Sequence, residues 1–170
     1  MKVLFKIGSG LLRCIRQDLY RKHPYAHERV GFITAKAAAL AGGGLCVTAY
    51  GYETVADDHY MDRPEVGAFV GAAGLRAALQ HAYRAKCSMF HVHLHEHRGR
   101  PWFGEYDLSE NAKFVPDFFN VAPATPHGAV ILSHDAAAGL CWRAGSQEPQ
   151  VISEVVEGGA PLRIFRGIKV

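Results

Sequence analysis

The sequence is poor in cysteine, with four in 170 residues, and no two of them form a CxxC pair. Cys14, Cys46, Cys87 and Cys141 are widely separated and each lies in an apolar segment. The usual spacing of a thiolate zinc site is therefore excluded, and we interpret all four as small buried hydrophobic residues. Unpaired, scattered thiols are typical of a reducing compartment, so we expect a cytoplasmic protein.

Long apolar runs and dense clusters of positive charge are also missing. No stretch of 18 apolar residues occurs, and Lys6, Arg13 and Arg16 interrupt the N-terminal segment, so we expect neither a membrane span nor a signal peptide. The net charge is only +3, without a run of Lys and Arg, and this argues against a nucleic-acid partner. No linker, repeat or low-complexity segment divides the chain.

The composition that remains is that of an ordinary globular protein, with 49% hydrophobic and 21% charged residues. Its length suits one domain that spans residues 1–170. Period-two and turn patterns predict strands at 2–7, 28–36, 45–52, 87–95, 127–135, 138–145, 151–156 and 161–170. Helical spacing predicts helices at 8–22, 72–86 and 108–119. We therefore expect an α/β fold with a mostly antiparallel sheet flanked by helices.

Two of these helices carry predicted end signals. Ser9 is expected to cap the first helix, and Ser109 is expected to begin the third, which Pro116 would limit. Segments 28–52 and 127–145 each read as a hairpin, with the glycines of "AGGG" forming the first turn. His127 and His134 flank the second hairpin's first strand and are interpreted as structural.

The unusual stretch is "SMFHVHLHEHRGRPWFGEYD", residues 88–107, in which histidine stands at every second position. Side chains two residues apart on a strand point the same way, which suits two neighbouring ligands of one metal ion. The four histidines are His91, His93, His95 and His97, and Phe90, Val92 and Leu94 form the opposite, apolar face. A solvated edge strand is the structural alternative for the same alternation.

A third metal ligand must come from another segment, and Asp107, after a loop that contains Pro101, is the candidate. A hydrolytic zinc site keeps three protein ligands and leaves the fourth position for water. The pairs His91/His93 and His95/His97 remain alternatives, but His93/His95 has the best spacing to Asp107. The zinc-protease pattern HExxH and the deaminase pattern HxE with PCxxC are both absent.

These residues resemble the JAB/MPN family in its metal-bearing JAMM (MPN+) form. The family has a Glu in an early "ExxGxL" strand, then His-x-His at a strand end, then Ser-x-x-Asp. This chain offers "ERVGFI" with Glu28, then "HLH" with His93 and His95, then "GEYD" with Asp107. The pattern departs at three points: Gly104 replaces the Ser, Glu96 replaces a usual Pro, and the loop is about one residue longer.

The resemblance implies a deaminase-like JAB/MPN fold and one zinc ion per chain, bound by His93, His95 and Asp107. Glu28 would act as general base toward a zinc-activated water. The enzyme would be a metallopeptidase, a deubiquitinase-like isopeptidase that cleaves after the C-terminal glycine of a ubiquitin-like protein. The glycine tail is expected to lie as an added strand beside the site, and E1- or E2-like enzymes are the implied partners.

Several residues near this motif have open roles. His91 is expected to orient a ligand, and His97 and Trp102 are expected to contact substrate or to pack in the loop. In the family the motif Ser helps stabilise the oxyanion, so a backbone N–H, Tyr106 or Ser109 would have to do so where this chain has Gly104. Two other functions remain as alternatives: a non-catalytic MPN scaffold that binds a protein partner, and a hydrolase acting on a ThiS-like sulfur-carrier adduct.

Overall fold

Alternating and apolar strand segments assemble into one mixed sheet with three α-helices, in a single α/β domain. The computed structural model describes residues 1–24, 26–63 and 65–167. The strands are β1 (Val3–Gly8), β2 (Val30–Ala39), β3 (Leu45–Thr54), β4 (Ser88–Leu94), β5 (His127–Leu132), β6 (Ala137–Trp142), β7 (Gln150–Val151), β8 (Glu154–Gly158) and β9 (Arg163–Arg166). The helices are α1 (Ser9–Leu19), α2 (Ala72–Ala85) and α3 (Glu105–Val121), with a short 3-10 helix at Asp57–His59.

The nine strands of the described residues follow the order β7-β6-β5-β4-β2-β3-β1-β8-β9. Both predicted hairpins are present, as β2–β3 and β5–β6. Pairing is parallel at β1–β3, β1–β8 and β4–β5 and antiparallel at the other junctions, so the predicted antiparallel majority is confirmed. The register shifts between Thr34 and Ala35 of β2, which pair with Gly51 and Ala49, so Tyr50 is the extra residue of a bulge in β3 that adds twist to the curved sheet.

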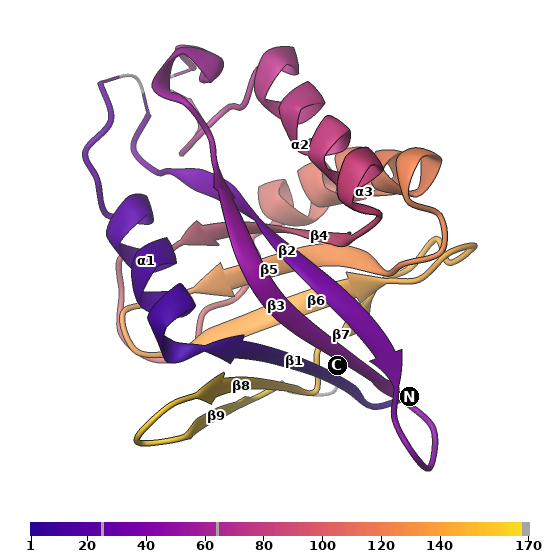
Figure 1. The fold of residues 1–170 in the computed structure, drawn as a ribbon. Helices are drawn as coiled ribbons and strands as arrows, with labels where there is room; N and C mark the ends of the chain where they lie inside the picture. The colour runs from indigo at the N-terminus through magenta and orange to yellow at the C-terminus, as the bar shows by residue number, and fades with distance from the viewer. Residues whose placement is uncertain (25, 64, 168–170) are drawn as a thin grey trace.

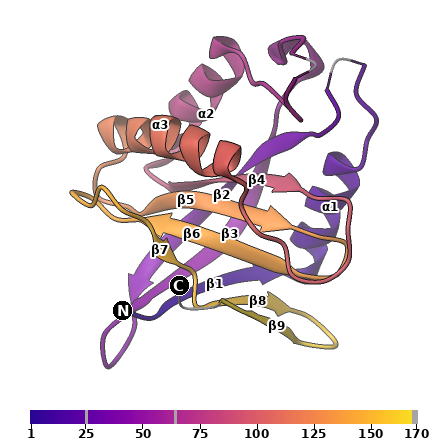
Figure 2. The same cartoon turned by 180° about the vertical axis from the view of Figure 1, so that it is seen from behind.

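Helices cover both faces of the sheet, as Figures 1 and 2 show from opposite sides. On one face the α1 residues Leu12, Ile15 and Leu19 pack in one core with the β4 face of Phe90, Val92 and Leu94. On the other face α2 and α3 pack against β2 and β4 in a second core, through Ala78, Ala82, Phe118, Phe32 and Met89. Burial of the apolar β4 face leaves its histidine face toward α2 and α3.

The helix ends differ from the sequence predictions. Helix α3 begins at Glu105, because the Asp107 carboxylate accepts a hydrogen bond from the Gly104 N–H and caps the first turn. The start predicted at Ser109 was therefore wrong. Pro116 lies inside the helix, at an exposed position, and does not end it. Ser9 is the first residue of α1, and Gly8 stands at its N-cap without a side-chain hydrogen bond.

Other differences concern strand ends. Strand β2 begins at Val30, so Glu28 lies in the loop that leads into the strand and not in the strand itself. The predicted last strand is shorter, at Arg163–Arg166, and residues 168–170 of that prediction lie outside the described residues. Within the described part of the chain, no helix has the length and apolar character needed to cross a membrane.

His127 has the structural role that was expected for it. The buried ring accepts a hydrogen bond from the Met89 N–H and donates one to the Ala122 carbonyl oxygen. Burial lowers its pKa to about 4, so the ring stays neutral at physiological pH. It joins the start of β5 to the start of β4, the strand that carries His91 and His93.

Candidate metal centre

The pairing of β2 with β4 determines which side chains meet beside the histidines. Val30 lies opposite His93 and Phe32 lies opposite His91 in the antiparallel ladder. Residues that face each other across a ladder point to the same side of the sheet. Along the same line, the residue two positions before Val30 is Glu28, and the residue two positions after His93 is His95. The strand pairing therefore brings Glu28 toward the His93/His95 pair.

His93, His95 and Asp107 form a compact group of ligand atoms. The Nε2 atoms of His93 and His95 are 3.3 Å apart. The Asp107 Oδ1 lies 3.5 Å from the His93 Nε2, and the Asp107 Oδ2 lies 3.9 Å from the His95 Nε2. Ligands about 2.0–2.1 Å from a tetrahedral zinc ion are about 3.3–3.4 Å apart. The types of these donor atoms and the distances between them both fit a zinc ion after small movements of the side chains.

His95 is suited to a neutral, metal-binding form. Burial and the neighbouring His93 lower the pKa of His95. A neutral imidazole offers the lone pair that a metal ion requires, whereas an imidazolium ion offers none. The surroundings of His95 therefore favour metal binding over protonation. His93 is only 2% exposed.

Asp107 is held in place by the start of α3. Its Oδ2 accepts a hydrogen bond from the Gly104 N–H at 2.9 Å, which leaves Oδ1 toward His93. Burial alone would raise the pKa of Asp107, but the hydrogen bond and charge of His93, together with the Gly104 N–H, outweigh it and lower that pKa. The carboxylate is also in the first helical turn, where negative charge is stabilised. Asp107 thus offers an ionised carboxylate to a metal ion.

Glu28 also lies close to the two histidines. One carboxylate oxygen of Glu28 and one ring nitrogen each of His93 and His95 all lie within 4.8 Å of one another. Burial raises the pKa of Glu28, and the charges of Asp107 and Glu96 raise it further, while His93 opposes them. The two carboxylates beside the histidine pair therefore have pKa values shifted in opposite directions.

The backbone around Glu28 is anchored to the loop before α2. The N–H groups of His27 and Glu28 both donate to the Gly67 carbonyl oxygen, at 2.9 Å each. A Cβ atom at residue 67 would stand 2.7 Å from the Glu28 Oε2, so any side chain there would displace the carboxylate. Glycine at this position is required by that close approach.

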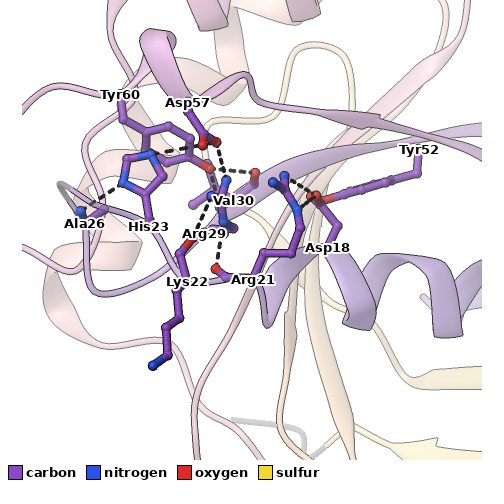
Figure 3. A network of polar contacts seen from close by, with 10 residues as sticks. All are labelled: Asp18, Arg21, Lys22, His23, Ala26, Arg29, Val30, Tyr52, Asp57 and Tyr60. Carbon is purple, nitrogen blue, oxygen red and sulfur yellow. Dashed lines mark hydrogen bonds and ion pairs between the residues drawn. The ribbon is translucent and has the colours of Figure 1, made fainter.

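A polar network fixes the residues on both sides of Glu28 in the sequence, as Figure 3 shows. The buried Arg29 donates to the carbonyl oxygens of Arg21 and Lys22 and to the Asp57 carboxylate, at 2.7–2.9 Å. The Tyr60 hydroxyl bonds both the N–H and the carbonyl oxygen of Val30. The carboxylate that pairs with Arg29 is therefore that of Asp57.

The candidate ligands stand at a pocket of about 430 Å³ between the sheet and the two helices on this face. Glu28, His93, His95 and Asp107 all line it. The remaining lining residues are Val30, Phe32, Gly67, Ala68, Phe69, Val70, Leu75, His91, Tyr106, Glu110, Asn111 and Phe114. Convergent polar groups in a mostly apolar cavity are typical of a ligand or active site.

The other two histidines of the strand have different surroundings. His91 lines the pocket farther from Asp107, with its ring packed 5.8 Å from Phe32 and 5.2 Å from Phe114 between ring centres. Burial lowers its pKa to about 3, with His93 adding to the effect. His97 donates from Nδ1 to the Arg98 carbonyl oxygen and stacks on Trp102, which is 65% exposed. Neither His97 nor Trp102 lines the pocket.

The structure separates the two side chains considered as substitutes for the motif Ser. Tyr106 lines the pocket, whereas Ser109 is exposed on α3 and does not. Two other carboxylates of α3 have different surroundings from Asp107. Glu105 is exposed, and Glu110 forms an ion pair with Lys113 at 2.6 Å. Strand β4 already pairs with β2 and β5, so a substrate strand beside the site would have to pair with another segment, and the expectation of an added strand stays a prediction.

The pocket walls were not predicted from the sequence. Phe69 and Val70 come from the loop before α2, Leu75 from α2, and Phe114 and Asn111 from α3. Leu75 carried a helical-spacing signal for burial, but spacing does not reveal that a cavity borders it.

No family model matches the chain, and no curated protein matches it either.

Zinc binding should depend on His95 and Asp107 but not on His97. We expect about one zinc ion per chain by elemental analysis, and loss of a ligand should weaken binding by more than about 100-fold, since even outer contacts contribute 10- to 100-fold. His95→Ala and Asp107→Ala should be purified without zinc, and His97→Ala should retain it. Zinc retained in Asp107→Ala, or lost in His97→Ala, would contradict this ligand set.

Proposed function

We propose that the protein is a zinc-dependent hydrolase of the JAMM type, with a JAB/MPN-like fold. It cleaves the peptide or isopeptide bond after the C-terminal glycine of a ubiquitin-like protein, in deconjugation or in precursor processing. The observation that carries the proposal is the convergence of Glu28, His93, His95 and Asp107 on one pocket. The substrate class rests on the motif resemblance, and E1- or E2-like enzymes of the cytoplasm are the proposed partners.

The two carboxylates have different tasks in this proposal. His93, His95 and Asp107 hold the metal, because Asp107 has the lowered pKa of a group that stays ionised. Zinc, when bound, supplies a lowered water pKa and polarises a carbonyl group. Glu28 has the raised pKa expected of a general base that must release its proton again. Opposite pKa shifts in two neighbouring carboxyl groups are a general sign of such a division.

Glu28 acts on the proton in two steps. Its carboxylate accepts a proton from the attacking water and then donates it to the leaving amine, so that no acyl-enzyme forms. The Gly67 carbonyl oxygen fixes the Glu28 backbone, and the Arg29 network fixes the residues on either side. Tyr106, at the pocket wall, is the side chain best placed to donate to the developing oxyanion.

Gly104 is the one feature that favours the scaffold alternative, because the motif Ser is absent. The chain nevertheless has His93, His95 and Asp107, and a scaffold without metal would not need these three residues. A ThiS-like sulfur carrier, which also ends in glycine, is the alternative substrate.

Replacing Glu28 by Gln should separate metal binding from turnover. Glu28→Gln should bind zinc like the wild type, and hydrolysis of a glycine-terminated ubiquitin-like fusion should fall by at least about 100-fold, since a general base contributes about 10²–10⁴. Glu96→Gln, at an exposed neighbouring position, is the matched control and should retain activity. Wild-type turnover in Glu28→Gln would rule out Glu28 as the base.

Restoring the motif Ser should raise activity. A Cβ atom at Gly104 would meet only the Asp107 Oδ2, at an ordinary 3.5 Å, and the backbone φ of −69° is open to any residue. Gly104→Ser should therefore fold normally and turn over at least about tenfold faster, because one oxyanion donor is worth about 10²–10³. Gly104→Ala adds the same Cβ without the hydroxyl and should leave kcat unchanged. Equal rates for the two variants would contradict an oxyanion position at residue 104.

A further inference from the structure

The pocket extends well beyond the four candidate catalytic and ligand residues. Its volume of about 430 Å³ lies in the range of about 300–1,000 Å³ that encloses small molecules and large side chains. Glycine has no side chain, so a glycine tail at the metal ligands leaves these further walls without contact. These walls therefore leave room for another part of the substrate.

The further walls are mostly apolar and come from separate elements. The apolar walls comprise Phe32 of β2, Phe69 and Val70 of the loop before α2, Leu75 of α2 and Phe114 of α3. Polar groups come from His91, Tyr106, Glu110 and Asn111. Phe32 is 2% exposed, and Val70, Leu75 and Phe114 pack against the same buried core. These walls are therefore preformed by the folding core, and covering them with an apolar group is favourable.

Charge in the pocket argues for an uncharged occupant. None of the described lining residues is Lys or Arg, so an acidic side chain would find no Lys or Arg among them for an ion pair. The acidic lining residues are Glu28, Asp107 and Glu110. The first two act at the metal centre in the proposed function, and Lys113 neutralises Glu110 across 2.6 Å. A cationic side chain would therefore find no free carboxylate.

We propose that this pocket is a specificity subsite for a bulky apolar side chain directly beside the bond that is cleaved. The inference rests on the proposed function, because it takes the histidine pair and Asp107 as the position of that bond. It adds that the glycine end is joined to a residue, or to a leaving amine, that carries an aromatic or large aliphatic group. Substrates with a small or acidic group at this place are disfavoured.

Hydroxamates test the subsite without turnover, because they bind zinc and carry a chosen side chain. Calorimetry on the zinc-loaded full chain compares 3-phenylpropanohydroxamate with acetohydroxamate. The phenyl compound should bind about 10- to 100-fold more tightly, as expected when an apolar pocket is filled. Leu75→Trp and Ala68→Leu, which fill part of the pocket, should reduce this ratio to about threefold or less. Tyr83→Trp, exposed on the same helix, should behave like the wild type.

The other outcomes distinguish the subsite from the metal centre. Equal affinity of the two hydroxamates for the wild type would overturn the subsite and leave the zinc centre standing. A preference that persists in both pocket-filling variants would place the phenyl group elsewhere and would also overturn it. A chain that takes up no zinc and binds neither compound would overturn the proposed function, and the subsite with it.

Discussion

The register between β2 and β4 is the constraint on which the candidate site depends. With Val30 opposite His93, the histidine face of β4 and the start of β2 point to the same side of the sheet. A slip by one residue would turn the histidines toward α1 and the apolar face of β4 toward the pocket. Burial of Phe90, Val92 and Leu94 in the α1 core opposes that slip. The same hydrophobic packing that stabilises the sheet therefore also sets the geometry of the ligands.

The start of α3 links folding to chemistry in a similar way. Asp107 uses one oxygen to cap the helix at Gly104 and turns the other toward His93. The cap, the helix end and the histidine hydrogen bond together favour the ionised form, whereas burial and the acidic neighbours favour the neutral form of Glu28. Two carboxyl groups that share one pair of histidines thereby acquire opposite proton affinities. In the proposed function, this contrast assigns metal binding to Asp107 and proton transfer to Glu28.

Much of the site could be predicted from sequence, because its signals are local. The period-two histidines specify a strand face, and the "GEYD" motif supplies the distant carboxylate. The start of α3 is also encoded locally, since an acid three residues after a glycine can cap a helix, but Ser109 gives a competing signal. The pocket could not be predicted, because Phe69 and Phe114 are distant in sequence. They line one pocket only because α2 and α3 pack together. The two-sided pairing of β4 likewise depends on β5, a later segment whose position no local pattern indicates.

The central claim is that two histidines and one carboxylate of this chain bind zinc. X-ray absorption at the zinc edge of the loaded wild-type protein tests it most directly. We expect a four-coordinate site with two imidazole nitrogens and with oxygen ligands at about 2.0–2.1 Å, and without sulfur at about 2.3 Å. A spectrum with three or more imidazoles, which would include His91 or His97, or one with a sulfur ligand, would contradict the assignment of His93, His95 and Asp107.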